Sequence, residues 1–228
     1  MKLIIGNKNY SSWSMRPWLL MTELDIDFDE RILYFDSFEQ GSEFKREIVK
    51  VNPTGRVPTL ITDHGAVWDT LAIVETLAEL SPQKGIWPKN PAQRALARSV
   101  CAEMHSGFQS LRNLCPMNIE ASLAEVGNTL LAEHASLASD VNAVDDLLRP
   151  IIQEFSSGGF LFGDYSAADA FYTPVASRFK TYGLPASDTL STYFSLLLNT
   201  KSCLAWTKAA LAEHRFVAFD EPYREKGV

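Results

Sequence analysis

Three hydroxyl side chains stand close together near the start of the chain. Ser11, Ser12 and Ser14 follow a short apolar run and precede a helical pattern. Pro17 has no backbone N–H and favours the first turn of a helix, so the segment predicts a helix cap nearer Ser14 than Ser11. The hydroxyls of Ser11 and Ser12 are then available beside unpaired helix amides, a place that attracts anions. The alternative is that all three serines only cap the helix and turn the chain.

The run from Val51 to Leu60 is a second candidate segment. Pro58 opens a strand pattern, where a proline removes no central hydrogen bond of a sheet. The main chain of Val57 is then available to pair with an extended peptide. X-Pro bonds in folded proteins are cis in only about 5–6% of cases, so these residues by themselves do not predict a cis bond. The alternative is an ordinary loop that enters a strand.

Two further segments carry helix-start signals. Asp69 or Thr70 caps a helix, and an N-terminus with an available hydroxyl can hold a carboxylate, but this segment taken alone favours plain capping. Ser166 and Asp169 have the spacing of a capping box. We interpret this second pair as a folding signal and not as a site.

The first eighty residues alternate between strand and helix patterns. The expected order is β-α-β-α-β-β-α, with a parallel first pair of strands and a hairpin turn at Asp63-His64-Gly65. The expected elements span residues 2–6, 15–24, 28–35, 43–51, 57–61, 66–68 and 69–80.

A proline-rich segment, 81–91, interrupts this alternation and predicts a linker. Almost everything beyond it has a helical pattern, and residues 221–228 are expected to form a frayed tail. The expected helices span residues 92–114, 119–134, 138–155, 167–182, 190–198 and 201–214.

Composition excludes several classes of protein. The chain carries 21 basic and 28 acidic residues, a net charge of −7, which argues against a nucleic-acid partner. No apolar run approaches the roughly 20 residues that a membrane helix needs, and the N-terminal apolar stretch is too short for a signal peptide. Cys101, Cys115 and Cys203 have neither disulfide-framework nor zinc-site spacing. We expect a cytoplasmic protein without a metal and without a membrane partner.

Taken together and in their order along the chain, the candidate segments described above resemble those of a cytosolic glutathione transferase. The resemblance covers nearly the whole chain. The resemblance rests on NPTGRVPTL, WDTLAIVETLAE and FLFGDYSAADAFYTPVASRF. It implies an α/β plus all-α fold, with an N-terminal thioredoxin-like domain, 1–82, a linker, 83–91, and an all-helical C-terminal domain, 92–228.

Within that family the chain is most similar to the zeta class. Ser11-Ser12-Trp13-Ser14 resembles the zeta segment Ser-Ser-Cys, and residues 107–114 resemble a zeta stretch that contributes Gln and Asn to the glutathione region. Two positions depart from the pattern. Trp13 stands where the zeta cysteine would be, which counts against isomerase chemistry. Asp69 stands where Glu or Gln is usual, while Thr70 keeps the hydroxyl that Ser normally supplies.

The resemblance also implies roles for individual residues. Ser11, with Ser12 as the second choice, would donate a hydrogen bond to the glutathione sulfur and favour the thiolate. Tyr10 is the reserve donor. Val57 would pair with the cysteinyl unit beside a cis Pro58, and Asp69 and Thr70 would hold the γ-glutamyl end. The residues expected to bind glutathione are Ser14, Arg56, Val57, Pro58, Asp69, Thr70, Gln109 and Asn113.

The implied function is attack of an activated glutathione thiol on a small electrophile, in a homodimer. The second substrate is expected between the domains, where Trp13, Phe108, Arg112 and Arg178 are candidate lining residues. Two alternatives stay open. One is a zeta-like cis–trans isomerase of the maleylacetoacetate type, and the other is a non-enzymatic scaffold or binding protein with the same fold.

Overall fold

A four-stranded mixed sheet forms the centre of the N-terminal part. The computed structural model describes residues 1–226. Strand β1 pairs in parallel with β2 and antiparallel with β3, and β3 pairs antiparallel with β4, in the order β2-β1-β3-β4. The parallel first pair and the hairpin are therefore confirmed. The strands are β1 (Lys2–Ile5), β2 (Asp29–Ile32), β3 (Thr59–Thr62) and β4 (Gly65–Trp68).

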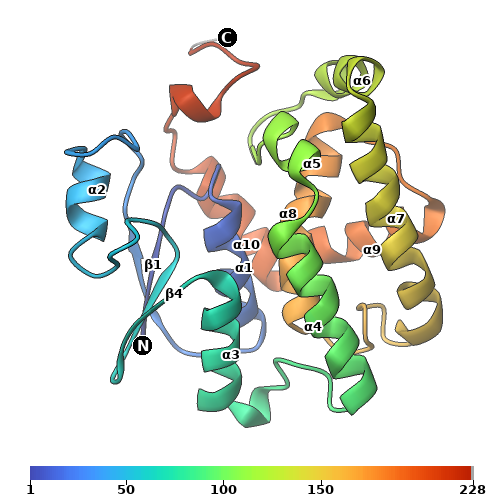
Figure 1. Ribbon diagram of the computed structural model, residues 1–228, viewed down its shortest axis with the longest axis horizontal. Coiled ribbons are helices and arrows are strands. Elements are labelled where there is room, and N and C mark those ends of the chain that lie inside the picture. Colours follow the sequence, from blue (N-terminus) through green and yellow to red (C-terminus); the bar gives the residue numbers. More distant parts are fainter. Residues whose placement is uncertain (227–228) are drawn as a thin grey trace.

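Three helices cover the two faces of this sheet. Helix α2 (Glu43–Ile48) lies on one side, and α1 (Ser12–Glu23) and α3 (Thr70–Leu80) lie between the sheet and the helical part of the chain (Figure 1). Ile4 of β1 and Phe44 and Ile48 of α2 form a small apolar core on the outer face. This arrangement makes the N-terminal part thioredoxin-like, as the sequence predicts.

The rest of the chain is helical and is built around α8. This helix is buried along nearly its whole length, and its start carries the predicted capping box, in which the Asp169 carboxylate accepts from Ser166 N at 2.9 Å. The helices are α4 (Pro91–Ser106), α5 (Gln109–Leu114), α6 (Ala124–Glu133), α7 (Ala135–Phe155), α8 (Ala167–Tyr182), α9 (Asp188–Leu198) and α10 (Lys201–Leu211), with 3-10 turns η1 (Pro82–Lys84) and η2 (Ala218–Asp220).

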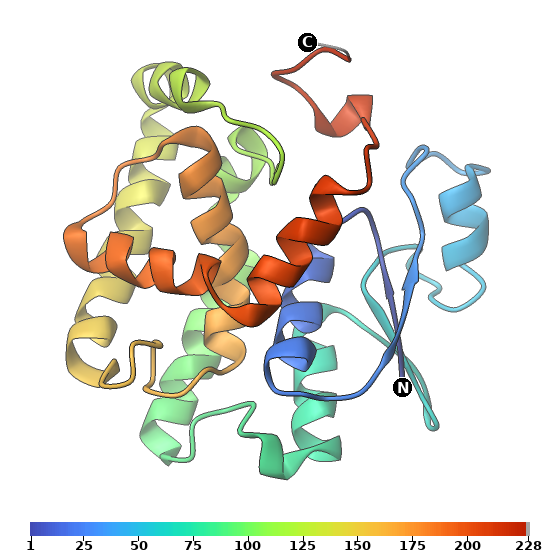
Figure 2. The same ribbon diagram turned by 180° about the vertical axis from the view of Figure 1, so that it is seen from behind.

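The two parts share one apolar core. Helix α1 packs against both α8 and α10, and Figure 2 shows α10 beside α1 before the chain turns toward the sheet. At this junction the rings of Trp18 and Trp206 pack edge to face, and the ammonium group of Lys8 lies against both, at 4.7 Å and 5.4 Å from their centroids. The cleft between the parts is therefore bordered by firmly docked elements.

Two helix predictions are wrong at their boundaries. The pattern over 92–114 is not one helix, because the chain breaks at Gly107 and Phe108 between α4 and α5. Phe108 adopts a left-handed conformation with φ 51°, and a side chain at Gly107 would come within 2.7 Å of the Glu103 carbonyl oxygen. Helix α6 begins at Ala124 rather than at Ile119, since the Asn9 carboxamide oxygen accepts from Ile119 N at 2.8 Å.

The predicted frayed tail is also wrong from Glu221 to Arg224, where Glu221, Tyr223 and Arg224 form hydrogen bonds. Glu221 is only 6% exposed and is held by several hydrogen bonds, because residues 213–224 run back across both parts of the molecule. Residues 227 and 228 of that predicted tail lie outside the described residues. None of the helices found in residues 1–226 combines the length and apolar character needed to cross a lipid bilayer.

Candidate functional site

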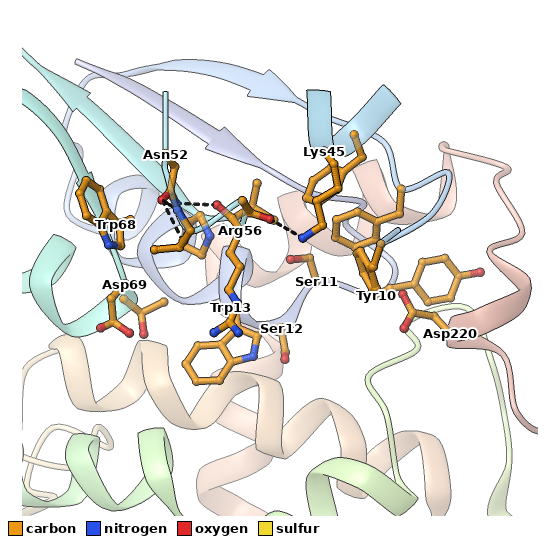
Figure 3. Close-up of a pocket in the computed structure, with 18 of the residues that line it drawn as sticks. Tyr10, Ser11, Ser12, Trp13, Lys45, Asn52, Arg56, Trp68, Asp69 and Asp220 are labelled. Carbon is orange, nitrogen blue, oxygen red and sulfur yellow. Dashed lines mark hydrogen bonds between the residues drawn. The ribbon is translucent and has the colours of Figure 1, made fainter. Parts of the chain in front are cut away.

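A cleft of about 910 Å³ lies where the sheet, the first helix, the helical part and the segment after α10 meet. We call this last segment, residues 212–226, the C-terminal segment. Its walls come from the loop before α1, the loop from β2 to α2, the loop before β3, the start of α3, helices α4 and α5, and η2. Figure 3 shows the side chains that point into it. Ser11, Ser12, Arg56, Val57, Pro58, Asp69 and Thr70, all predicted site residues, line this one cleft.

Ser11 is the N-cap of α1, which corrects the predicted cap nearer Ser14. Its hydroxyl oxygen accepts from Ser14 N at 3.4 Å, and its carbonyl accepts from Met15 N at 3.0 Å. Pro17 occupies the sixth position of the helix, because these bonds start the helix earlier than a proline at the first position would. Ser11 therefore combines a capping role with a place on the cleft wall.

Ser14 does not line the cleft. It is fully buried, and its hydroxyl accepts from Gly6 N at 3.1 Å and lies 2.7 Å from the Ser11 hydroxyl. Of the three serines, Ser14 thus ties the end of β1 to the start of α1 and supports Ser11 from behind.

Ser12 is held by the helical part of the chain. Its hydroxyl accepts a hydrogen bond from Arg178 Nη2 at 3.2 Å. Arg178 is 5% exposed and also donates to the carbonyls of Cys115 and Pro174, so its guanidinium group is a buried support and does not line the cleft. The expectation that Ser12 is unengaged is wrong for this reason.

The loop before β3 presents main-chain groups to the cleft. The Val57–Pro58 peptide bond is cis, as the family resemblance implies. Within residues 1–226, the N–H and C=O groups of Val57 have no hydrogen-bond partner. This leaves an extended edge at which a peptide can pair its own main chain.

Asn52 holds this loop in shape, a role that the sequence did not reveal. Its amide nitrogen donates to the Arg56 carbonyl at 2.8 Å and to Thr59 Oγ1 at 3.0 Å. Its amide oxygen accepts from Thr54 N at 2.9 Å (Figure 3). Because Asn52 is only 1% exposed, these bonds satisfy a side chain that could not otherwise be buried.

Lys45 is a second lining residue that sequence reasoning missed. It lies on α2, and its ammonium group donates to the Gly55 carbonyl at 2.8 Å (Figure 3). Together with Arg56 it brings positive charge to the sheet side of the cleft.

Asp69 and Thr70 meet a residue of the helical part. Asp69 caps α3 through a hydrogen bond from Leu71 N at 2.9 Å, with its main chain at φ 73°. His105 of α4 lies 3.2 Å from the Asp69 carboxylate through Nε2 and 3.4 Å from Thr70 Oγ1 through Nδ1. Burial, together with the charges of Arg16 and Arg112, lowers the pKa of His105 against the opposing effect of Asp69. The neutral imidazole can therefore donate to Asp69 and accept from Thr70.

Positive charge gathers around Trp13. The guanidinium groups of Arg16 and Arg112 lie 4.3 Å and 4.9 Å from its ring centroid, and His105 packs edge-on against it. Arg16 is fully buried, and its Nε and Nη1 atoms have no hydrogen-bond partner. Burial, and then the charges of Arg178 and Arg112, lower the pKa of Arg16 to about 9. No carboxylate in residues 1–226 forms an ion pair with these three arginines. Arg112 lines the cleft while Arg16 and Arg178 are buried behind it, so Arg112 is the guanidinium group that an anion there can contact.

Tyr10 lines the cleft, but its hydroxyl group is already engaged. It donates to Glu221 Oε1 at 2.7 Å and accepts from Val217 N at 3.3 Å. Burial and the Glu221 hydrogen bond raise the pKa of Tyr10 to about 12. The phenol is therefore a poor reserve donor for a thiol, and it serves instead to attach the C-terminal segment.

Besides Ser14 and Arg178, three further predicted residues do not line the cleft. Gln109 and Asn113 are exposed on α5, and the Gln109 amide donates to the Ser106 carbonyl at 2.8 Å. Phe108 is buried in the helical core. The break at Gly107 and Phe108 changes the direction of the chain before α5. The sequence predicts one continuous helix over 92–114 and therefore misses this change.

The cysteines lie away from the site. Cys101, Cys115 and Cys203 are buried, and burial raises the pKa of each thiol, to about 11 for Cys203. In the part of the chain that the structure describes, no group of three or more His, Cys, Asp or Glu side chains is arranged to hold a metal ion.

Known proteins share both the sequence and the fold. Residues 10–80 match the family model for the glutathione S-transferase N-terminal domain. Rat maleylacetoacetate isomerase is 30% identical over 175 residues, 74% of each chain, and a zeta-class glutathione S-transferase of Euphorbia esula is 25% identical over 135 residues, 59% of this chain and 58% of its own.

A solved structure supports the fold independently. A glutathione transferase homologue from Burkholderia gl BGR1 with bound glutathione superposes with a TM-score of 0.68 at 21% identity, covering 92% of this chain and 97% of its own. With the match to the N-terminal domain family and the relatives above, these findings show that the chain belongs to the cytosolic glutathione transferase family and is zeta-like within it.

Proposed function

We propose that this chain is a glutathione transferase in which the Ser11 hydroxyl donates a hydrogen bond to the glutathione sulfur and stabilises the thiolate. The observation that carries the proposal is the position of Ser11. It caps α1 at the wall of the same cleft that Val57 lines with unpaired main-chain groups. A thiol that pairs with Val57 there meets both a hydroxyl donor and the positive end of a helix.

Two effects lower the pKa of the bound thiol. A hydrogen bond to a charged acceptor contributes roughly 1.5–3 kcal/mol, and the helix dipole adds roughly 0.3–1 kcal/mol. One pKa unit corresponds to about 1.36 kcal/mol, so together they lower a thiol pKa near 8.5 by about one to three units. In the structure the Ser11 hydroxyl donates to the Ser14 hydroxyl at 2.7 Å, so this proton must turn from Ser14 toward the cleft to reach the sulfur.

The other cleft residues suit the two ends of glutathione. Thr70, at the start of α3, offers its main-chain N–H to the γ-glutamyl carboxylate, and its hydroxyl can turn from His105 Nδ1, 3.4 Å away, to donate there as well. Asp69 offers an acceptor to the α-ammonium group. Arg56 and Lys45 supply positive charge for the glycyl carboxylate. We infer that glutathione lies along the sheet side, with its sulfur toward Ser11.

The test is a pH titration of thiolate absorbance for glutathione bound to the purified protein. Ser11→Ala is expected to raise the thiol pKa by about one to two units, whereas Ser11→Thr keeps a hydroxyl and is expected to keep most of the effect. Because Ser11→Ala also removes a helix cap, Ser187→Ala, which removes the cap of α9, is the matched control for stability.

The outcomes separate enzyme from scaffold. A depressed thiol pKa that Ser11→Ala relaxes and Ser187→Ala does not supports the proposal. Binding of glutathione with an unchanged thiol pKa would indicate a binding or scaffold protein, and absence of binding would reject glutathione as the ligand. From the family resemblance we expect a cytoplasmic homodimer. Light scattering of the purified protein measures its oligomeric state.

A second candidate function is cis–trans isomerisation of an unsaturated dicarboxylic acid. Arg112, which lines the cleft beside Trp13, favours it, because maleylacetoacetate, named for several relatives, carries carboxylate groups. Trp13 in place of a cysteine counts against it. Glutathione-dependent isomerisation of maleylacetone by the wild type, lost in Arg112→Met, would support this function. The absence of turnover at saturating maleylacetone would exclude it.

A further inference from the structure

The C-terminal segment contributes one carboxyl group to the cleft. Asp220, the last residue of η2, lines the same cavity as Tyr10 and Ser11 and lies at the end opposite Asp69 (Figure 3). In the part of the chain that the structure describes, no hydrogen bond or ion pair engages its side chain; only burial and the neighbouring Glu221 act on it. The fold therefore makes no use of this carboxyl group.

The main chain around Asp220 is nevertheless fixed on both sides. Asp220 N donates to the Val217 carbonyl at 2.9 Å. The next residue, Glu221, accepts from Tyr10 at 2.7 Å and from Asn118 Nδ2 at 2.9 Å. These contacts join the loop before α1 to the segment after α5, so they hold the Asp220 carboxyl group at the cleft wall.

The surroundings favour the protonated form of this group. Burial, and then the negative charge of Glu221, raise the pKa of Asp220 to about 6. An acid with a pKa near the working pH is well matched to proton transfer. The other charged or titratable residues that line the cleft are Tyr10, Lys45, Arg56, Asp69, His105 and Arg112.

We propose that Asp220 is the acid that protonates the electrophile after glutathione addition, and that the electrophiles it serves are α,β-unsaturated carbonyl compounds. This inference rests on the proposed function, because it requires an activated glutathione thiolate in the cleft. It adds an acid from the C-terminal segment to the thiol-stabilising serine at the start of α1.

The chemistry balances. The thiol proton leaves to solvent when the thiolate forms. The thiolate then forms a carbon–sulfur bond at the β-carbon, and the electrons of the carbon–carbon double bond move toward the carbonyl to give an enolate. The Asp220 carboxylic acid donates its proton to the enolate α-carbon and becomes a carboxylate, which regains a proton from water. The net reaction is addition of one glutathione across one double bond.

Two probe substrates test this role. Addition of glutathione to trans-4-phenyl-3-buten-2-one needs a proton at the electrophile, whereas substitution on 1-chloro-2,4-dinitrobenzene expels chloride and needs none. The variant is Asp220→Asn. Glu225→Gln is the matched control, because it removes the same charge from an exposed position on the same segment.

Asp220→Asn is expected to lower kcat for the enone about 100-fold at pH 6, the lower end of what a positioned acid contributes, with little change in KM. Its kcat for the aryl halide is expected to stay at the wild-type value. In the wild type, the ratio of enone to aryl-halide turnover is expected to fall as pH rises through about 6. In Asp220→Asn this ratio is expected to be independent of pH.

Several results would overturn the proposal. An equal loss for both substrates would give Asp220 a structural role only, and unchanged turnover of both would give it no role in the reaction. A similar loss in Glu225→Gln would point to the net charge of the segment. If the wild type turned over neither substrate, the proposed function itself would fail, a result distinct from a wild type active on both and insensitive to Asp220→Asn.

Discussion

Replacing Tyr10 by Phe separates two roles that the sequence allowed for this residue. The hydroxyl joins the N-terminal part to Glu221, at 2.7 Å, and accepts from Val217 N. A hydrogen bond to a charged group contributes roughly 1.5–3 kcal/mol, so Tyr10→Phe is expected to lower the free energy of unfolding by that amount. Since Tyr10 is not placed as the thiol donor, the thiol pKa of bound glutathione is expected to stay unchanged.

Urea unfolding and the thiolate titration measure the two quantities on the same protein. Burial raises the pKa of Glu221, but hydrogen bonds from Arg224 and Tyr10 outweigh this effect and lower it. A carboxylate with a depressed pKa stabilises the fold above its unfolded pKa, about 4.3, and loses that contribution as pH falls through its folded pKa. The difference between wild type and Tyr10→Phe is therefore expected to shrink below about pH 4. An unchanged stability with a raised thiol pKa would refute this reasoning and make Tyr10 the thiol donor.

Three further variants test other parts of the cleft. Thr70→Ala is expected to weaken glutathione binding about tenfold or more by calorimetry, with an unchanged thiol pKa, because one hydrogen bond to a carboxylate is lost. Asn52→Ala is expected to cost at least about 2 kcal/mol in urea unfolding, since it leaves buried loop groups unsatisfied; an equal stability would contradict the role given to Asn52. Asp220→Asn is expected to be more stable than the wild type above pH 6, by no more than about 3 kcal/mol. The raised pKa of Asp220 makes wild-type stability fall as pH rises from about 4 to 6. Equal stability of the wild type and Asp220→Asn at pH 7.5 would therefore contradict the burial of this carboxyl group.

Signals that act within a few residues could be interpreted from the sequence. The capping box of Ser166 and Asp169, the cap at Asp69 and the hairpin at Gly65 each depend on neighbours in the chain, and each is present. The start of α1 shows the limit of such signals. Pro17 favours the first helical position, yet the bond from Gly6 N to Ser14 fixes the helix start earlier.

Contacts between residues far apart in the chain could not be foreseen. Ser12 and Arg178 are separated by 166 positions, and Tyr10 and Glu221 by 211. The apolar run from Phe216 to Phe219 stands just before Glu221, but it does not reveal that the carboxylate itself is buried or which residues bind it. Its partners exist only once the helical part has docked, which is why a well-ordered segment was predicted to be frayed.

The same long-range contacts indicate where the site belongs. Ser12 is bonded to Arg178 of α8, Thr70 lies against His105 of α4, and Tyr10 is bonded to Glu221 of the C-terminal segment. Each of these cleft residues comes from the thioredoxin-like part and is positioned by the helical part. The surface that we propose to bind the thiol therefore depends on docking of the two parts, although the motifs that carry the proposal lie in the first eighty residues. A change on α4 or α8 that loosens this docking is expected to impair glutathione binding without touching any residue of those motifs.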